Sequence, residues 1–489
     1  MKRLKKAALL LSALFLLYGC EDFLDLSPIS EETSDVAYNS ASQIEAALTG
    51  VYESFQAEYY VWDNVLFQDV RADNHYAGGD NPEIFQIDLL NISSTNSRLF
   101  RNWSNIYNAI AKANVVIENA PLVDDPQLTE TRRSQILGEA HFLRAFHYYT
   151  LVNLWGGVPL VTQFTASANP EDTQLPRSTE EEVFALILSD LELAIASLPD
   201  TYGGNAAINK ARATAGAANA LAAKASLQKP VADYMAALQY IEALEASAAG
   251  YRLISYPALF DGNNYNNAES ILEVQYLGAN EGNFGPQLVL PPSISGDTWR
   301  KFVTPSQDLL NAYNAEGDVI RRDASVLFET VNWVDEYWGN RPGSSIPFAY
   351  KWKNADSWAS SNRPYLLRYG DIVLLKAEAL AGLNRLSEAA IEVNRIRNRV
   401  SLADLPVTAS SSQENMRRAI LKERRLELAQ EAQRWDDLVR FESLVTTMNA
   451  LNEIDLRTGS PTQYDMNSSK ILLPIPQEEL DRNPNLNQN

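Results

Sequence analysis

The stretch that decides the fold is DIVLLKAEALAGLNRLSEAAIEVNRIRNR, which spans residues 371–399. Apolar side chains recur in it at steps of three and four residues, which is the spacing of an amphipathic helix. The spacing predicts one helix over 371–383 and a second over 387–399, separated by a short polar break. Because each helix has only one apolar face, the two must pack against each other or against further helices.

The same helical spacing recurs along most of the chain, at residues 42–55, 102–119, 139–154, 179–198, 214–227, 234–247 and 416–441. The pair at 377–391 and the pair whose helices begin at Ala217 and Tyr234 look like degenerate tetratricopeptide repeats. Helix pairs of this kind cannot bury their apolar faces alone, so they stack on one another. We therefore expect a mainly α fold with a tetratricopeptide-like helical-repeat scaffold.

The helical signal fades between Ser255 and Pro364. Glycine, asparagine, proline and aromatic residues dominate there, with short strand-like runs such as Ile271–Tyr276. Five of the nine tryptophans fall in this stretch, namely Trp299, Trp333, Trp338, Trp352 and Trp358. We expect an irregular, partly β, aromatic-rich and ligand-facing lobe over 255–364. It would be inserted between an N-terminal helical-repeat region at 41–254 and a C-terminal helical-repeat region with an extended tail at 365–489.

The N-terminus has the layout of a bacterial lipoprotein signal. Four cations within residues 2–6 precede an apolar run from Ala7 to Tyr18, and Gly19-Cys20 follows. The run is shorter than the ~20 residues of a membrane-spanning helix, so it indicates a cleaved signal peptide over residues 1–19. Cys20 is the only cysteine of the chain and the expected site of lipidation, and residues 20–40 are the expected tether. The alternative is a plain secretory signal beside an incidental cysteine.

The chain is acidic. Its formal net charge is −21 at pH 7, and removal of the four signal cations makes it about −25. A field of this sign disfavours binding to nucleic acids and to anionic membrane surfaces. With 46% hydrophobic and 21% charged residues, and no long apolar run after the signal, we expect the mature chain to be globular and water-soluble apart from its anchor.

Five segments together resemble the SusD/RagB family of nutrient-binding lipoproteins of the bacterial outer membrane. They are CEDFLDLSP at 20–28, EAHFLRAFHYYTLVNLWGGVPL at 139–160, RYGDIVLLKAEAL at 368–380, ERRLELAQEAQRWDDLVR at 423–440 and LPIPQEELDRNPNL at 473–486. Any single segment could arise by chance, but five in this order are highly specific.

The resemblance spans nearly the whole chain, so it implies the fold of that family. It also implies a surface-exposed protein, lipid-anchored in the cell outer membrane, that binds oligosaccharides and delivers them to a SusC-like TonB-dependent transporter. On this view the protein is not an enzyme and needs no cofactor. At Gly370 the chain departs from the family, which more often has alanine there.

Sugar binding calls for exposed aromatic rings beside planar hydrogen-bonding groups such as those of Asn, Asp and Arg. Two regions offer this mix. The residues are Trp62, Arg71, Asp73, Asn74, His75 and Tyr76 in a polar loop predicted after the first helix, and Trp299, Trp333 and Trp338 in the aromatic lobe. We predict that loop and lobe converge on one shallow binding face. The alternatives are core packing for the tryptophans and local turn chemistry for the polar residues.

Motifs for catalysis are lacking. The sequence has no Gly-x-Ser-x-Gly elbow, no His-Glu-x-x-His pair, no Walker loop and no Gly-x-Gly-x-x-Gly turn after a strand. Its only histidines are His75, His141 and His147, and the last two lie in one predicted helix. A histidine-based triad or zinc site is therefore not expected. The run 261–265 hints at calcium but fits a turn better.

Three other functions stay open. A RagB-like member of the family would take up peptides instead of glycans. An anchored surface glycosidase needs only two carboxylates, and the chain has 62 acidic residues. An interaction scaffold without a small ligand is the third alternative.

Overall fold

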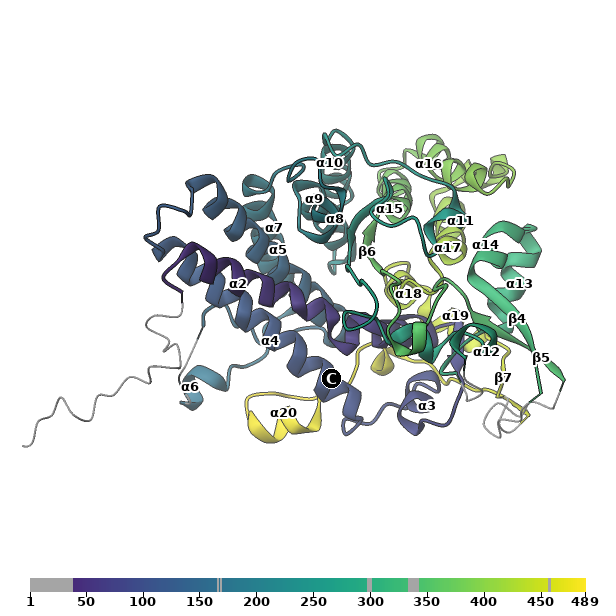
Figure 1. Ribbon diagram of the computed structural model, residues 1–489. Helices are drawn as coiled ribbons and strands as arrows, with labels where there is room; N and C mark the ends of the chain where they lie inside the picture. The colour runs from purple at the N-terminus through teal and green to yellow at the C-terminus, as the bar shows by residue number, and fades with distance from the viewer. Residues whose placement is uncertain (1–37, 165–166, 168, 297–300, 333–342, 456–458) are drawn as a thin grey trace, which may run out of the picture.

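The computed structural model describes residues 38–164, 167, 169–296, 301–332, 343–455 and 459–489 (Figure 1). The predicted signal peptide, the lipidation site Cys20 and most of the tether lie outside the described residues. So do three of the predicted binding residues, Trp299, Trp333 and Trp338. Predictions about these positions stay predictions.

Helices make up most of the described chain, which confirms the predicted mainly α fold class. The long helices of the N-terminal half are α2 (Ala41–Tyr52), α4 (Ser97–Asn119), α5 (Glu130–Trp155), α7 (Glu180–Ser197), α9 (Ala215–Gln228) and α10 (Tyr234–Glu245). Those of the C-terminal half are α15 (Tyr369–Gly382), α16 (Leu386–Arg399) and α17 (Gln413–Leu428), and the short α18 (Arg434–Arg440) follows. Each overlaps a range that periodicity predicts.

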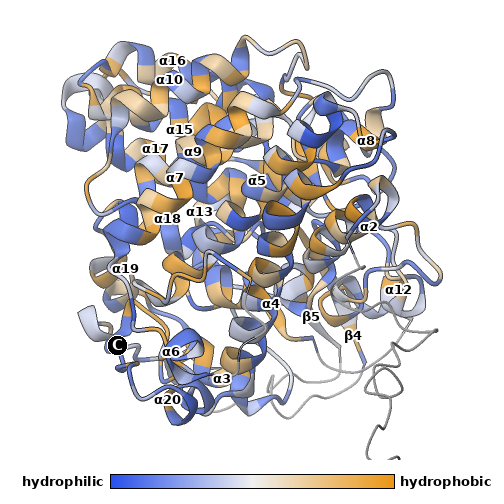
Figure 2. Cartoon of the chain, turned by 90° about the vertical axis from the view of Figure 1, so that its left-hand side faces the viewer, coloured by the Kyte–Doolittle hydropathy of each residue, from blue (hydrophilic) through white to orange (hydrophobic). Residues whose placement is uncertain are grey.

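The long helices pack as a curved row of neighbours. Helix α5 contacts α2, α4 and α7, and the row continues from α7 through α9, α10 and α15 to α16 and α17. In Figure 1 it runs from α2 and α4 on the left, past α9 and α10 at the top, to α15 and α16 on the right. Figure 2 shows hydrophobic residues gathered on helices in the middle of the molecule, such as α5 and α9. The predicted stacking of helix pairs is confirmed, since α9–α10 packs on α15–α16.

Small residues let the stacked pairs approach closely. Residues 216–227 of α9 are all buried, and alanine is the commonest residue among them. At the end of α15, a Cβ atom on Gly382 would lie only 2.3 Å from Cγ of Tyr234 on α10. Protein interiors are too closely packed to allow such an overlap, so glycine at this position permits the close approach of the pair α9–α10 to the pair α15–α16.

The irregular region, 255–364, holds short helices and half of the strands that the structure describes. Its helices are α11 (Tyr256–Leu259), α12 (Pro292–Ser295), α13 (Gln307–Glu316) and α14 (Val319–Ser325). The other short helices are α3 (Pro82–Asp88), α6 (Pro170–Thr173), α8 (Ala206–Ala211), α19 (Leu444–Ala450) and α20 (Gln477–Arg482).

The strands pair antiparallel, two by two. The pairs are β1 (His75–Ala77) with β3 (Val303–Pro305), β2 (Ser270–Glu273) with β6 (Tyr365–Arg368), β4 (Val326–Val331) with β5 (Ser344–Ala349), and β7 (Ile454–Asp455) with β8 (Ser460–Pro461). Strand β2 confirms a strand in the run predicted at 271–276. Through β6, which leads directly into α15, it joins the irregular region to the helical scaffold.

One helix prediction is wrong. Residues 416–441 do not form a continuous helix, because α17 ends at Leu428 and α18 begins at Arg434. Gln430 and Ala432 in between have φ angles of 68° and 55°, in the left-handed region that non-glycine residues rarely adopt. Periodicity within the segment could not show this break, because contacts with distant parts of the chain impose it.

Helix α17 carries a set of buried ion pairs. Arg424 pairs with Asp371 (2.8 Å) and with Asp437 (2.9 Å). Glu427 receives three arginine side chains, those of Arg321, Arg368 and Arg399. The i, i+3 spacing of Arg424 with Glu427 and of Glu431 with Arg434 would allow pairs along one helix face, but each of these side chains pairs with a distant segment instead. The network ties α17 to α15, α16, α14 and β6.

Gly370 makes room for this network. A Cβ atom at this position would lie 2.2 Å from Nη1 of Arg368 and 2.6 Å from Oε1 of Glu269. The departure from the usual alanine of the family therefore coincides with the place where the ion pairs approach the backbone of α15 most closely.

Asp73 and Arg434 form a buried bidentate pair that joins the N-terminal half to α18. The two arginine–carboxylate distances are 2.6 and 2.7 Å, and both side chains are buried. Arg425 adds a hydrogen bond of 2.7 Å to the carbonyl oxygen of Asp73. Planar two-point contacts of this kind fix orientation as well as distance.

We predict that Asp73→Ala lowers the free energy of unfolding by about 3–5 kcal/mol, because it leaves Arg434 buried without its carboxylate. Urea denaturation measures the loss. Glu388→Ala is the control, because Glu388 forms an exposed pair with Arg385 and its loss should leave stability almost unchanged. Equal effects of the two substitutions would contradict a structural role for the buried pair.

Candidate ligand-binding cleft

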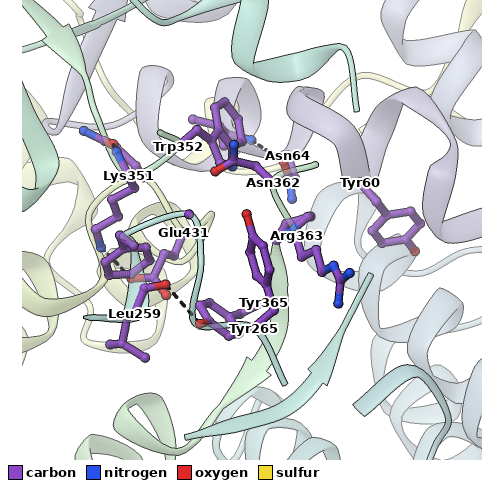
Figure 3. A pocket seen from close by; sticks show the side chains of 15 residues that line it. Tyr60, Asn64, Leu259, Tyr265, Lys351, Trp352, Asn362, Arg363, Tyr365 and Glu431 are labelled. Carbon is purple, nitrogen blue, oxygen red and sulfur yellow. Dashed lines mark hydrogen bonds and ion pairs between the residues drawn. The ribbon is translucent and has the colours of Figure 1, made fainter. Parts of the chain in front are cut away.

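Two adjoining hollows share the lining residues Tyr60, Asn64, Tyr365 and Glu431, so they form one cleft. The first encloses about 590 Å³ and the second about 610 Å³ of empty space, counting the solvent at their mouths. Figure 3 shows side chains of the first hollow around its opening, among them Trp352, Tyr265 and Tyr365. We call the two hollows together the central cleft.

The central cleft has walls from parts of the chain that are far apart in sequence. Segments 259–265 and 351–364 close the first hollow. Side chains of α5 and α9, including Tyr149, Asn153 and Lys224, close the second. The turn 430–433 between α17 and α18 contributes to both. The break in the predicted helix thus forms a wall of the cleft.

Asp69 holds this turn in its left-handed conformation. Its carboxylate accepts the backbone N–H of Gln430 on Oδ1 (3.2 Å) and that of Ala432 on Oδ2 (2.9 Å). Strained backbone persists only where surrounding contacts impose it, and these two hydrogen bonds supply the contacts. Asp69 is fully buried, and burial raises the pKa of its carboxyl group to about 6.

The facing wall is built from two π-helical turns, η3 (Tyr59–Asp63) and η4 (Leu66–Val70). Turns of this type are rare and occur often at functional sites. Here they place Tyr60 and Asn64 in the cleft. The hydroxyl of Tyr60 lies 2.8 Å from Nδ1 of His147, and Nε2 of His147 lies 2.9 Å from Oγ of Ser54. Burial lowers the pKa of His147 to about 3, so a neutral imidazole fixes the Tyr60 ring.

We predict a pH dependence of stability that comes from His147. The folded-state pKa lies below the ordinary value of 6.5, so its contribution is complete above pH 6.5 and is lost as the pH falls toward 3. His147→Gln cannot titrate, so the advantage of wild type over this variant should shrink by about 1.4 kcal/mol per pH unit below pH 6. Urea denaturation at pH 7, 6 and 5 measures it, and a difference that stays constant would contradict the assignment.

Most charges of the central cleft are paired within the protein. Glu431 forms ion pairs with Lys351 (2.5 Å) and Arg368 (2.5 Å). Lys224 pairs with Asp371 at 2.6 Å and also donates to the side chain of Gln433. These groups therefore have their counter-charges before any ligand enters.

The two remaining charges are of opposite sign and are held by neutral groups. Arg363 donates to Oε1 of Gln275 (2.6 Å) and to the carbonyl oxygen of Tyr276 (3.0 Å). Asp436 accepts from the side-chain amides of Gln68 (2.9 Å) and Asn153 (3.1 Å), and burial raises its pKa to about 6. The lining charges that have no ion-pair partner are thus one cation and one acid.

Aromatic rings and amides complete the lining. Trp352, Tyr265 and Tyr365 are half-buried, so each ring keeps part of its surface open. The lining of the two hollows also includes side-chain amides, several of them bonded within the protein, namely those of Asn64, Asn153, Asn362, Gln430 and Gln433. Apolar ring faces beside neutral hydrogen-bonding groups suit a ligand that has both C–H surfaces and hydroxyl groups.

The predicted exposed loop at 71–76 is wrong. Arg71, Asp73, Asn74 and His75 are all at least 98% buried, and none of them lines the central cleft. Arg71 stacks on the ring of Trp435, with 3.9 Å between its guanidinium carbon and the ring centre. His75 lies on β1, and burial lowers its pKa to about 3. These polar side chains are buried because arginines and carbonyl groups of the C-terminal half meet them inside the protein.

The other residues predicted to bind ligand in this part of the chain also have contacts within the protein. Asn74 donates to Asp69 (2.8 Å) and accepts from Arg425 (2.9 Å). Tyr76 is half-buried opposite Thr304 in the β1–β3 pair. Trp62 is 3% exposed, with Arg98 over its ring, so core packing describes it better than ligand contact. Residues 71–76 therefore do not line the cleft.

None of the binding residues named from the sequence lines the cleft, although segments 259–265 and 351–364 of its first hollow lie in the lobe predicted over 255–364. No motif in the sequence marks Tyr60 or Tyr365 as a binding residue. Glu431 and Gln433 lay inside a predicted helix. The usable signal was the long family-like segment 423–440, whose charges are too many for one exposed helix face.

A second groove lies on another side of the molecule. Its lining includes Trp103 and Tyr107 of α4, Gln174, and Arg482 of α20, and it encloses about 1000 Å³ counting the solvent at its mouth. Tyr107 donates to the carbonyl of Pro159, and Trp103 is 3% exposed, so its aromatic rings are engaged in packing. The groove is the alternative ligand site.

Within the described ranges, no group of three or more His, Cys, Asp or Glu side chains is arranged to hold a metal ion. Among the helices that the structure describes, none combines the length and the apolar character needed to cross a membrane.

Two family profiles match the chain. That of the SusD family matches residues 259–489, and one described as "Starch-binding associating with outer membrane" matches residues 22–227. The chain belongs to the SusD-like family. The resemblance found in the sequence is thereby confirmed.

Known relatives match over nearly their full length. A SusD-like protein of Formosa agariphila is 28% identical over 100% of this chain and 99% of its own, and one of Bacteroides ovatus is 26% identical over 90% and 83%. A solved SusD-like protein from Bacteroides fragilis gives a TM-score of 0.76 at 25% identity, covering 95% and 99% of the two chains. A laminarin-binding SusD-like protein gives 0.75 at 25% identity, covering 92% and 99%.

Proposed function

We propose that this SusD-like protein binds neutral oligosaccharides in the central cleft without cleaving them, and delivers them to a SusC-like TonB-dependent transporter. The observation that carries the proposal is the composition of the cleft. Most of its charges are paired within the protein, and the half-buried rings of Trp352, Tyr265 and Tyr365 lie beside side-chain amides. Such a lining matches sugars, which present C–H faces and hydroxyl groups but no charge.

The relatives support a carbohydrate ligand. One neighbour in structure is a laminarin-binding SusD-like protein, and the profile that matches the N-terminal half names starch binding and association with the outer membrane. The net charge of −21 adds to this, because it repels polyanionic glycans. Neutral glucans are therefore the first ligands to test.

The carboxylates of the cleft support binding without hydrolysis. A glycosidase needs two carboxyl groups beside the scissile bond, one to donate a proton and one to act as base or nucleophile. Asp436 has a raised pKa, but Glu431 has both oxygens engaged by Lys351 and Arg368. Among the residues that line the cleft, no second carboxylate is therefore free to act as base or nucleophile.

The sequence supports a place at the cell surface. Cys20 would carry the lipid that anchors the protein in the outer membrane, and residues 20–40 would form the tether. Two or more acyl chains anchor a protein stably, since each buried methylene contributes about 0.8 kcal/mol. An anchored binding protein beside a transporter raises the local concentration of its cargo there.

We predict that calorimetry detects binding of neutral oligosaccharides, from laminarin or starch, to the purified protein. Trp352→Ala should weaken the binding about tenfold, which corresponds to ~1.4 kcal/mol, because it removes a stacking surface from the cleft. Tyr107→Ala in the second groove is the matched control and should leave the affinity unchanged.

The outcomes separate the alternatives. If calorimetry detected heat of binding with peptides and none with glycans, RagB-like uptake of peptides would replace the proposed function. Release of reducing sugars from a polysaccharide panel would show a glycosidase. A loss of affinity in Tyr107→Ala but not in Trp352→Ala would move the site to the second groove.

A further inference from the structure

The second hollow of the central cleft contains one acid without an ion-pair partner among the described residues. The carboxylate of Asp436 accepts hydrogen bonds from the side-chain amides of Gln68 on Oδ1 (2.9 Å) and of Asn153 on Oδ2 (3.1 Å). Both donors are neutral, so they do not balance the negative charge. Each carboxylate oxygen can accept a further hydrogen bond, because it has two lone pairs.

Asp436 also lies outside the ion pairs that neighbour it. Lys224 and Arg440 both act on its charge from a distance. They belong to a set of buried ion pairs with Arg424, and this set contains as many acids as cations. The acids are Asp371, Glu378 and Asp437. The set is therefore neutral without Asp436, which is left with no counter-charge.

The surroundings of Asp436 oppose its ionisation. Burial raises the pKa of its carboxyl group to about 6. The hydrogen bond from Gln68 offsets part of this effect, and the charge of Asp437 adds to it. Most of the group is still ionised at pH 7. A charge held away from water without a counter-charge is costly, and a bound cation removes part of that cost.

Aromatic side chains stand around this carboxylate. The second hollow is lined by Tyr59, Tyr60, Phe146 and Tyr149 in addition to Asp436. Burial, and then the charges of neighbouring groups that include Asp436, raise the pKa values of Tyr59 and Tyr149, so both rings are close to the carboxylate. The faces of aromatic rings attract cations. Rings and carboxylate together therefore favour a positively charged group over an anion.

The number of ligand groups decides which kind of cation fits. A metal ion needs several carboxylate or imidazole ligands, and within the described residues no three such side chains are arranged to hold one. A primary ammonium group has three N–H donors. It needs only acceptors such as the two oxygens of Asp436, with the remaining contacts supplied by aromatic rings and water.

We propose that the second hollow is a binding site for a primary ammonium group. Asp436 accepts its N–H groups, and the rings of Tyr59 and Tyr149 lie around it. The ligand is an oligosaccharide with a free amino group on the ring that enters this hollow, and its uncharged rings occupy the first hollow. The choice of an amino sugar rests on the proposed function, which supplies the sugar chain.

Three monosaccharides that differ only at C2 test the proposal by calorimetric titration of the purified protein at pH 7. They are D-glucosamine, D-glucose and N-acetyl-D-glucosamine, which carry an ammonium, a hydroxyl and an acetamido group there. We expect D-glucosamine to bind about tenfold more tightly than the other two, because only it offers Asp436 a charged donor. The comparison uses wild type, so it does not depend on the folding of any variant.

Asp436→Asn removes the charge and keeps the shape of the side chain. We expect it to reduce the affinity for D-glucosamine about tenfold and to leave the affinity for D-glucose nearly unchanged. Asp481→Asn is the matched control, because the carboxylate of Asp481 also accepts a side-chain amide, that of Gln477 (2.9 Å), but is exposed and lies outside the central cleft. It should bind all three sugars like wild type.

The outcomes for the ammonium site and for the proposed function are separate. Equal affinities of wild type for D-glucosamine and D-glucose would overturn the ammonium site, and so would an unchanged preference for D-glucosamine in Asp436→Asn. Tighter binding of a lysine-containing peptide through Asp436 would overturn the choice of an amino sugar. If laminarin and starch oligosaccharides fail to bind while D-glucosamine binds through Asp436, the proposed function falls and the ammonium site stands.

Discussion

The contact between segment 69–74 and the turn between α17 and α18 is the one on which the other features depend. Both carboxylate oxygens of Asp73 accept hydrogen bonds from Arg434. The carboxylate of Asp69 accepts hydrogen bonds from the backbone N–H groups of Gln430 and Ala432. Both acids are buried, so neither can be left without its partners at small cost. These bonds hold the N-terminal half against the C-terminal half and define one wall of the central cleft.

The same pairing explains the chemistry of the cleft. Charged side chains are abundant around it, yet they pair with one another across elements that are distant in sequence. The two exceptions, Arg363 and Asp436, are of opposite sign and are held by neutral groups, and half-buried rings and side-chain amides make up much of the remaining lining. Rigid walls also limit the conformational entropy lost when a ligand binds. On the proposed function, a scaffold built on buried ion pairs carries a site for uncharged, hydroxyl-rich molecules.

Local patterns predicted the helices but not the site. The scaffold helices α9, α10, α15 and α16 follow from apolar spacing, which each helix carries in its own sequence. The break after Leu428 depends on Asp69, which lies 361 residues away from Gln430 and 363 from Ala432 along the chain. Likewise, Asp73 and Asn74 look like surface residues until the arginines that bury them are in place. Long-range pairing of polar groups leaves no periodic signal.

The most direct test is a crystal structure of the protein with a bound neutral oligosaccharide. The account predicts electron density for sugar rings between Tyr365 and the turn 430–433, with Gln430 and Ala432 still left-handed and still bonded to Asp69. Sugar density confined to the groove of Trp103 and Tyr107, with the central cleft empty, would contradict it.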